Sequence, residues 1–155
     1  MWQRIQTVFL VLMIISLIAS IFFPIWRLEL YDGDYKELSV LHYTEIIDGD
    51  KTIIYWPFSI TTTMIVAAIT LGIIEIRRYD NRLLQMKLGA FNSLILMGCM
   101  IAAVVFANQV IKENPEGWKY GFGLYLPGAA VLFNLVANRF IRRDEKLVRD
   151  SERIR

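Results

Sequence analysis

The chain has 155 residues, of which 55% are hydrophobic and 21% are charged, and its formal net charge is +2. A soluble domain is about 45–50% apolar, so this composition excludes a disordered chain and gives no reason to expect a nucleic-acid partner. The single cysteine, Cys99, cannot form an internal disulfide, which excludes a disulfide-stabilised scaffold.

The hydrophobic residues are concentrated in four long uncharged runs, at residues 7–26, 57–74, 88–111 and 120–138. A helix rises about 1.5 Å per residue, so about 20 residues cross a hydrocarbon core that is about 30 Å thick. None of the runs has the polar face that a helix of a small soluble protein needs. Within a bilayer, backbone polar groups must pair inside their own segment. We therefore predict one domain with four transmembrane helices.

The first run is too long for a cleaved signal peptide. Its apolar core of about 20 residues exceeds the roughly 7–15 residues of a signal peptide. Pro24, Ile25 and Trp26 stand where a cleavage site would need small residues. We expect this run to remain in the protein as the first span.

Lys and Arg are distributed unequally between the two sides of the membrane. One base precedes the first run, four lie between the second and third runs, and seven follow the last run, whereas the other two loops hold three and two. Because segments rich in Lys and Arg stay in the cytoplasm, both termini are predicted to be cytoplasmic. Short loops after the second and third runs favour an up-down bundle. Four tryptophans lie at run ends, where interfacial anchors are expected: Trp2, Trp26, Trp56 and Trp118.

The loop of residues 27–56, on the outer side, is predicted to form β structure. Two Asp-Gly-Asp triplets, at 32–34 and 48–50, alternate with strand-forming residues. Asp-Gly in this setting is typical of hairpins, because glycine adopts the positive φ of tight turns. We predict strands near residues 28–31, 38–47 and 51–55. The alternative for the triplets is a weak cation site, although no frame supplies the ligands of an EF-hand.

The predicted spans contain polar side chains but no charged ones. Glu75, Lys112 and Arg139 fall at run ends, so we expect no charge at membrane depth, where charges mark ion paths and proton relays. The candidate intramembrane polar contacts are Asn92, Asn108, Asn134 and Asn138. These amides either hydrogen-bond between helices or line a polar cavity for a small molecule or lipid. In the second case a kink at Pro127 would act as a hinge.

Residues 139–155 form a basic tail with helical propensity, in which Glu145 and Arg149 form a favourable i,i+4 pair. The candidate docking residues of the tail are Arg139, Arg142, Arg143, Asp144, Glu145, Lys146, Arg149, Arg153 and Arg155. Near an anionic leaflet each base contributes about 1 kcal/mol. The tail therefore either docks a membrane or cytoplasmic protein partner or lies against lipid headgroups.

The sequence carries no recognisable catalytic motif. His42 is the only histidine and lies far from Cys99 in the chain, whereas a zinc site needs three or four ligands. A P-loop, G-x-S-x-G, H-E-x-x-H and G-x-G-x-x-G are all absent from the sequence. We expect no catalytic, cofactor-binding or metal-binding residues, and a protein that is not an enzyme.

Both ends of the chain resemble those of a known family. The start reads Met-Trp-Gln-Arg-Ile-Gln-Thr before the first run. The end contains Ala-Asn-Arg at 137–139, Arg-Arg-Asp-Glu-Lys-Leu-Val-Arg at 142–149 and Ser-Glu-Arg-Ile-Arg at 151–155. The chain is similar over its full length to an uncharacterised four-span membrane family of Bacteroidota, the domain of unknown function 4293. The resemblance implies a multi-pass inner-membrane protein of a Gram-negative bacterium and implies no activity.

The expected fold is an all-α, up-down bundle of four transmembrane helices. A small β meander in the first extracytoplasmic loop and a basic cytoplasmic C-terminal helix complete it. The expected function is that of a non-enzymatic accessory or interaction subunit of a membrane complex, because a distinctive charged tail is attached to uncharged spans. The alternative is a carrier for small molecules or lipids.

Overall fold

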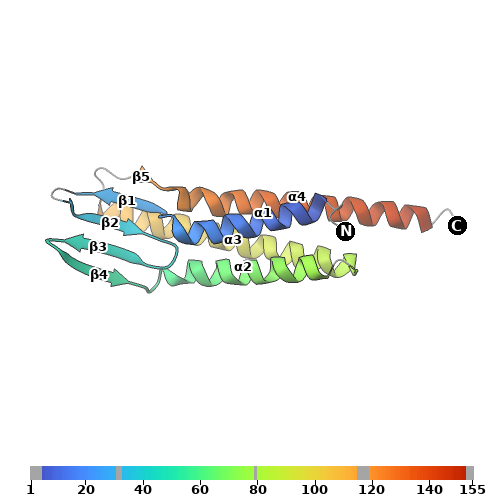
Figure 1. Ribbon diagram of the computed structural model, residues 1–155, viewed down its shortest axis with the longest axis horizontal. Helices are drawn as coiled ribbons and strands as arrows, with labels where there is room; N and C mark the ends of the chain where they lie inside the picture. The colour runs from blue at the N-terminus through green and yellow to red at the C-terminus, as the bar shows by residue number, and fades with distance from the viewer. Residues whose placement is uncertain (1–4, 31–32, 79, 115–118, 153–155) are drawn as a thin grey trace.

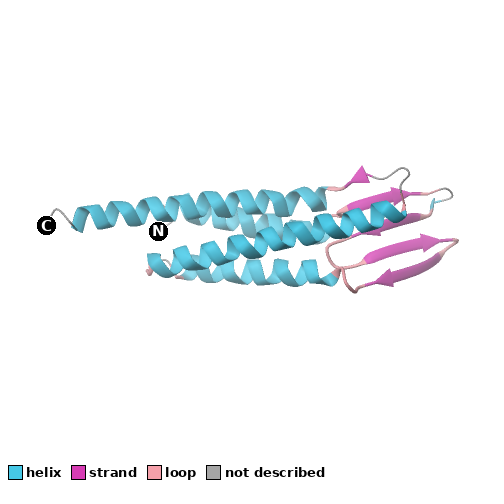
Figure 2. Ribbon diagram, turned by 180° about the vertical axis from the view of Figure 1, so that it is seen from behind, coloured by secondary structure: helices cyan, strands magenta, loops and turns pink. Residues whose placement is uncertain are grey.

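The computed structural model describes residues 5–30, 33–78, 80–114 and 119–152. Within these residues, four helices lie side by side, and a sheet extends from one end of the bundle (Figures 1 and 2). The helices are α1 (Ile5–Phe22), α2 (Ser59–Arg77), α3 (Arg82–Glu113) and α4 (Phe122–Glu152). All four are long and apolar enough to cross a membrane, as the four runs predict.

The last two helices extend beyond their hydrophobic runs. Helix α3 begins at Arg82 because the side-chain oxygen of Asn81 accepts a hydrogen bond from the Leu84 N–H at 3.0 Å. Helix α4 joins the fourth span to the predicted tail as one helix of 31 residues. It continues through Pro127, so the predicted kink does not interrupt it.

The helices form a ring in which each packs mainly on two neighbours. The most extensive helix contacts join α1 to α4, α4 to α3, α3 to α2, and α2 to α1. Small residues at the buried positions of α3, including Gly89, Ala103 and Ala107, let neighbouring backbones approach closely. Between α1 and α4, the rings of Phe9 and Phe140 stack with their centroids 5.7 Å apart.

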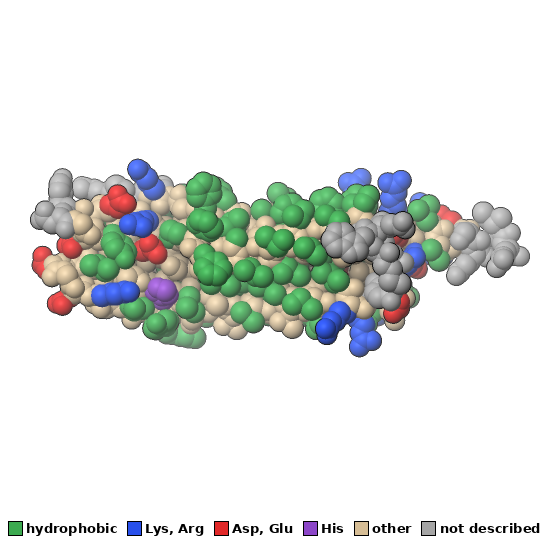
Figure 3. Space-filling model, in the orientation of Figure 1, with side chains coloured by type: hydrophobic (Ala, Val, Ile, Leu, Met, Phe, Trp, Pro, Cys, Tyr) green, Lys and Arg blue, Asp and Glu red, His purple; other side chains and the backbone are tan. Residues whose placement is uncertain are grey.

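The outer surface of the bundle is apolar. Leu94 on α3 is 66% exposed and Leu132 on α4 is 63% exposed. Figure 3 shows hydrophobic side chains over the middle of the molecule and charged side chains towards its two ends. Exposed apolar area on this scale is unfavourable in water. The arrangement is consistent with a protein embedded in a membrane.

The sheet corrects the predicted fold class, because the protein is not all-α. It is antiparallel and, in the part of the chain that the structure describes, has five strands in the order β4-β3-β2-β1-β5. It is larger than the predicted meander. The strands are β1 (Trp26–Glu29), β2 (Tyr35–Leu38), β3 (Tyr43–Ile47), β4 (Asp50–Ile54) and β5 (Lys119–Tyr120). The strand predicted at 38–47 begins only at Tyr43, as β3, and β2 before it was not predicted. The two are separate because the chain turns after Leu38, where the Ser39 N–H donates to the His42 carbonyl at 2.9 Å.

The second Asp-Gly-Asp triplet forms a turn, as predicted. Asp48 and Gly49 have φ values of 53° and 84°, and they are the two residues between the paired positions Ile47 and Asp50. Positive φ at both central residues is the requirement of a type I′ hairpin. In the first triplet Gly33 has φ of 88°, and an oxygen of Asp34 accepts a hydrogen bond from the Asp48 N–H at 3.2 Å.

Aromatic side chains join the sheet to the bundle. The Phe58 ring lies 5.9 Å from Tyr43 in β3 and 5.4 Å from Phe106 in α3, measured between ring centroids. Burial raises the pKa of Tyr43 to about 12, with further contributions from the carboxylates of Glu45 and Glu113, so this phenol is neutral at pH 7.

The tryptophans only partly follow the prediction of interfacial anchors. Trp56 is exposed, but Trp26 is fully buried in β1 and belongs to the core. β1 begins at Trp26, two residues before the predicted strand, so Trp26 belongs to the sheet and not to the end of a span. Trp2 and Trp118 lie outside the described residues.

Candidate functional site

Buried polar side chains gather at the end of the bundle farthest from the sheet. The buried ones are Glu75 from the last turns of α2, Gln85 from α3, and Asn134 and Asn138 from α4, and the half-buried Ser93 of α3 lies among them. We call these five residues the polar cluster. Glu75 is 0% exposed, and Gln85, Asn134 and Asn138 are also buried. Polar groups at such positions are costly unless they find partners.

The amide nitrogens of the polar cluster connect the helices. Asn134 Nδ2 donates to Ser93 Oγ at 2.9 Å and to the Gly89 carbonyl at 3.2 Å. Asn138 Nδ2 donates to Ser93 Oγ at 3.3 Å. Gln85 Nε2 donates to the backbone carbonyl of Glu75 at 3.1 Å. The amide donors thus link α4 to α3 and α3 to α2.

The oxygens of the same side chains are not satisfied. Five buried oxygens of the polar cluster have no hydrogen-bond partner among the described residues: Glu75 Oε1 and Oε2, Gln85 Oε1, Asn134 Oδ1 and Asn138 Oδ1. Asn92 Oδ1, outside the polar cluster, is also unpaired. Gly89 leaves space for two of them, because a Cβ atom there would collide with Asn138 Oδ1 and lie 2.8 Å from Glu75 Oε1. The polar cluster therefore has an excess of acceptors.

The position of Glu75 corrects the expectation that no charged residue lies inside the spans. Glu75 is near the end of α2, but its side chain points into the bundle and is fully buried. The signal that could have found it is the buried stripe of α2, which runs through Ile65, Ala68 and Gly72 and reaches Glu75 at helical spacing.

The structure brings together two of the four predicted asparagines and places the other two elsewhere. Asn134 and Asn138 belong to the polar cluster. Asn92 is buried as well, and its Nδ2 lies 3.6 Å from Met13 Sδ of α1. Asn108 lies on the exposed face of α3. The four amides therefore do not surround one common cavity.

The predicted tail is the C-terminal part of α4, which extends past the ends of the other helices (Figures 1 and 2). The first residue of α3 contacts the tail, because Arg82 Nη1 donates to the Asp144 carbonyl at 2.9 Å. Asp144 and Glu145 are half-buried there. The exposed candidate docking residues of the described tail are Arg139, Arg142, Arg143, Lys146 and Arg149. Arg153 and Arg155 lie outside the described residues.

The two ends and the spans between them match one family over nearly the whole chain. Residues 2–154 match the family described as Domain of unknown function (DUF4293). The chain belongs to this family. No curated protein matches it.

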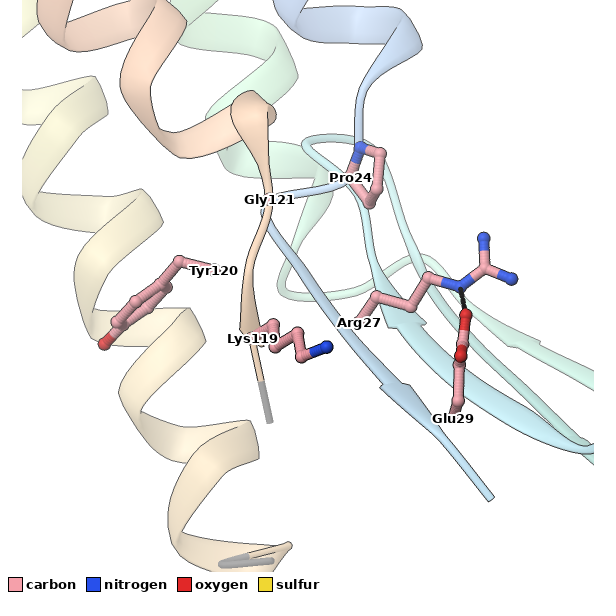
Figure 4. Close-up of a pocket in the computed structure, with 6 residues that line it drawn as sticks. All are labelled: Pro24, Arg27, Glu29, Lys119, Tyr120 and Gly121. Atoms are coloured by element: carbon pink, nitrogen blue, oxygen red, sulfur yellow. Dashed lines mark ion pairs between the residues drawn. The ribbon is translucent and has the colours of Figure 1, made fainter. Parts of the chain in front are cut away.

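Two surface grooves of this DUF4293 chain lie beside features described above, one at the sheet and one at the polar cluster. One lies beside the sheet and is lined by Pro24, Arg27, Glu29, Lys119, Tyr120 and Gly121 (Figure 4). In it, Arg27 Nε pairs with Glu29 Oε1 at 3.5 Å, and both side chains are largely exposed. Such a pair is weak.

The second groove lies between α3 and α4, next to the polar cluster. Its lining residues are Ala90, Ser93, Leu135, Asn138, Arg139 and Arg142. Ser93 and Asn138 therefore belong both to this groove and to the polar cluster. Among the described residues, no group of three or more His, Cys, Asp or Glu side chains could hold a metal ion.

Proposed function

We propose that this DUF4293 protein is a multi-pass inner-membrane protein with both termini in the cytoplasm. We further propose that it acts as a non-enzymatic accessory subunit of a membrane complex. The observation that carries the proposal is the free-standing end of α4. It is a continuous helix that projects beyond the bundle and presents exposed bases together with Leu147, which is 62% exposed.

An isolated helical segment of this length is only marginally stable in water by itself. Here the bundle holds it, because α4 is continuous with the fourth span and Arg82 binds the Asp144 carbonyl. The segment therefore has a fixed direction and presents its bases and Leu147 in a defined arrangement. An ordered surface with these properties suits a protein partner at the membrane, because little conformational entropy is lost on binding.

The proposed orientation predicts opposite labelling of two introduced cysteines. Asp48→Cys, in the β3–β4 turn, should react with a membrane-impermeant maleimide added to spheroplasts, whereas Arg149→Cys should react only after the membrane is permeabilised. The native Cys99 is buried and should not react with the maleimide. Labelling of Arg149→Cys in intact spheroplasts would contradict the orientation.

The proposed partner predicts a position-specific crosslink. A photoreactive amino acid at Leu147 should give a discrete protein adduct in native membranes, and the adduct should weaken when Arg142 and Arg143 are replaced by glutamine. The matched control is the same amino acid at Leu132, which is equally exposed but lies on the apolar face of the bundle. Lipid adducts alone at both positions would count against a protein partner.

A further inference from the structure

Two side-chain oxygens from different helices lie next to Gly89, close to the space that a side chain there would occupy. Asn138 Oδ1 and Glu75 Oε1 both lie within 2.8 Å of the point that a Cβ of residue 89 would occupy. Gln85, one turn before Gly89 on α3, is tied to the Glu75 backbone by its amide nitrogen. A buried carboxylate oxygen and a buried amide oxygen that border the same space are unfavourable unless a hydrogen-bond donor or a positive charge reaches them.

The polar cluster lacks positive partners for its oxygens. Its amide nitrogens all donate to protein acceptors, whereas its five buried oxygens accept nothing within the described residues. One donor cannot correct this imbalance. A proton on the Glu75 carboxyl would satisfy a single acceptor and leave the other amide oxygens unpaired.

The charge of Glu75 is also uncompensated. None of the ion pairs in the described part of the chain includes Glu75, and the neighbouring Arg77 and Arg78 are exposed. A buried, unpaired carboxylate is costly in protein and more so in a membrane. A bound cation would supply the missing charge and contact several oxygens at once.

The composition of the site limits which cation fits. Carboxylate and amide oxygens are ligands of hard cations. Glu75 is the one acidic residue of the polar cluster, and the described residues offer no group of three potential metal-binding side chains. A single negative charge balances a monovalent ion. We propose that the polar cluster binds a small monovalent cation, such as Na⁺, through Glu75 and the side-chain oxygens of Asn138 and Gln85.

The test compares Na⁺ with choline on the full-length protein in lipid nanodiscs at equal ionic strength. A ligand that binds only the folded state raises the unfolding midpoint, so NaCl should raise it for the wild type relative to choline chloride. Glu75→Gln should abolish the Na⁺-dependent increase, whereas Glu145→Gln, in the tail, should retain it. Equilibrium binding of radioactive Na⁺ should show a saturable site in the wild type that is lost in Glu75→Gln.

A second pair of variants keeps the test valid if Glu75→Gln does not fold. Asn138→Ala removes one proposed ligand and should weaken Na⁺ binding at least tenfold, whereas Asn108→Ala, on the exposed face of α3, should leave it unchanged. The proposal would be overturned if Na⁺ does not change the unfolding midpoint of the wild type and an infrared band of a protonated carboxyl disappears in Glu75→Gln. An equal Na⁺ effect in the wild type and Glu75→Gln would overturn it as well.

Discussion

Gly123→Ala is expected to destabilise the protein by about 2–3 kcal/mol, at the upper end of the usual range for overpacking. Gly123 stands at the start of α4, where its N–H donates to the Pro24 carbonyl at 3.0 Å. A Cβ there would collide with the Phe23 carbonyl oxygen and lie 2.7 Å from the carbonyl carbon and oxygen of Pro24. These are backbone atoms and cannot rotate away. The loss of stability is measured by denaturant unfolding in micelles, followed by the fluorescence of the buried Trp26.

Gly128→Ala is the matched control on the same helix. A Cβ at this position would come no closer than 3.7 Å to Met100 Cε, which is ordinary van der Waals contact. Because alanine favours helices over glycine by up to about 1 kcal/mol, this variant should be as stable as the wild type or slightly more stable. Equal losses in the two variants would show that the close approach at Pro24 is not the cause.

The fifth strand could not be predicted, because its position depends on the close approach of Gly123 to Pro24 and on other contacts between distant parts of the chain. β5 is two residues long and has no strand pattern of its own, so its pairing with Trp26 and Arg27 depends on contacts between distant parts of the chain. The Gly121 N–H donates to the Ile25 carbonyl at 2.9 Å and brings the segment to the sheet edge. The turn at Asp48 and Gly49, by contrast, was predictable because its requirement for positive φ is local.

The four helices were predictable because hydropathy is averaged over about 20 residues. The candidate site was predictable only in part, since hydropathy does not report which face of a helix a residue occupies. Asn134 and Asn138 are four residues apart, a spacing that puts them on one face of a helix, and both donate to Ser93 Oγ. Asn108 has the same chemistry but lies on the exposed face. Glu75 was missed because its place near the end of the run concealed its inward orientation.

Gly89→Ala is expected to lower the stability by about 1–3 kcal/mol, even though alanine favours a helix. The added methyl group would collide with Asn138 Oδ1, and it would lie 2.8 Å both from Asn138 Cγ and from Glu75 Oε1. Both side chains are buried, and Asn138 is held by Ser93 Oγ. Their movement would break contacts between α3 and α4. Chemical denaturation in micelles should show a lower unfolding midpoint.

Gly98→Ala separates this effect from the general consequence of adding a methyl group to α3. Its Cβ would meet only Met64, with Cε at 2.6 Å, and the end of a methionine side chain moves at little cost. We expect a change below about 1 kcal/mol. A double-mutant cycle sharpens the comparison: if Asn138 causes the clash, Asn138→Ala should reduce the cost of Gly89→Ala, because the colliding amide is gone. If the changes in stability caused by Gly89→Ala and Asn138→Ala are strictly additive, the added methyl group does not collide with Asn138.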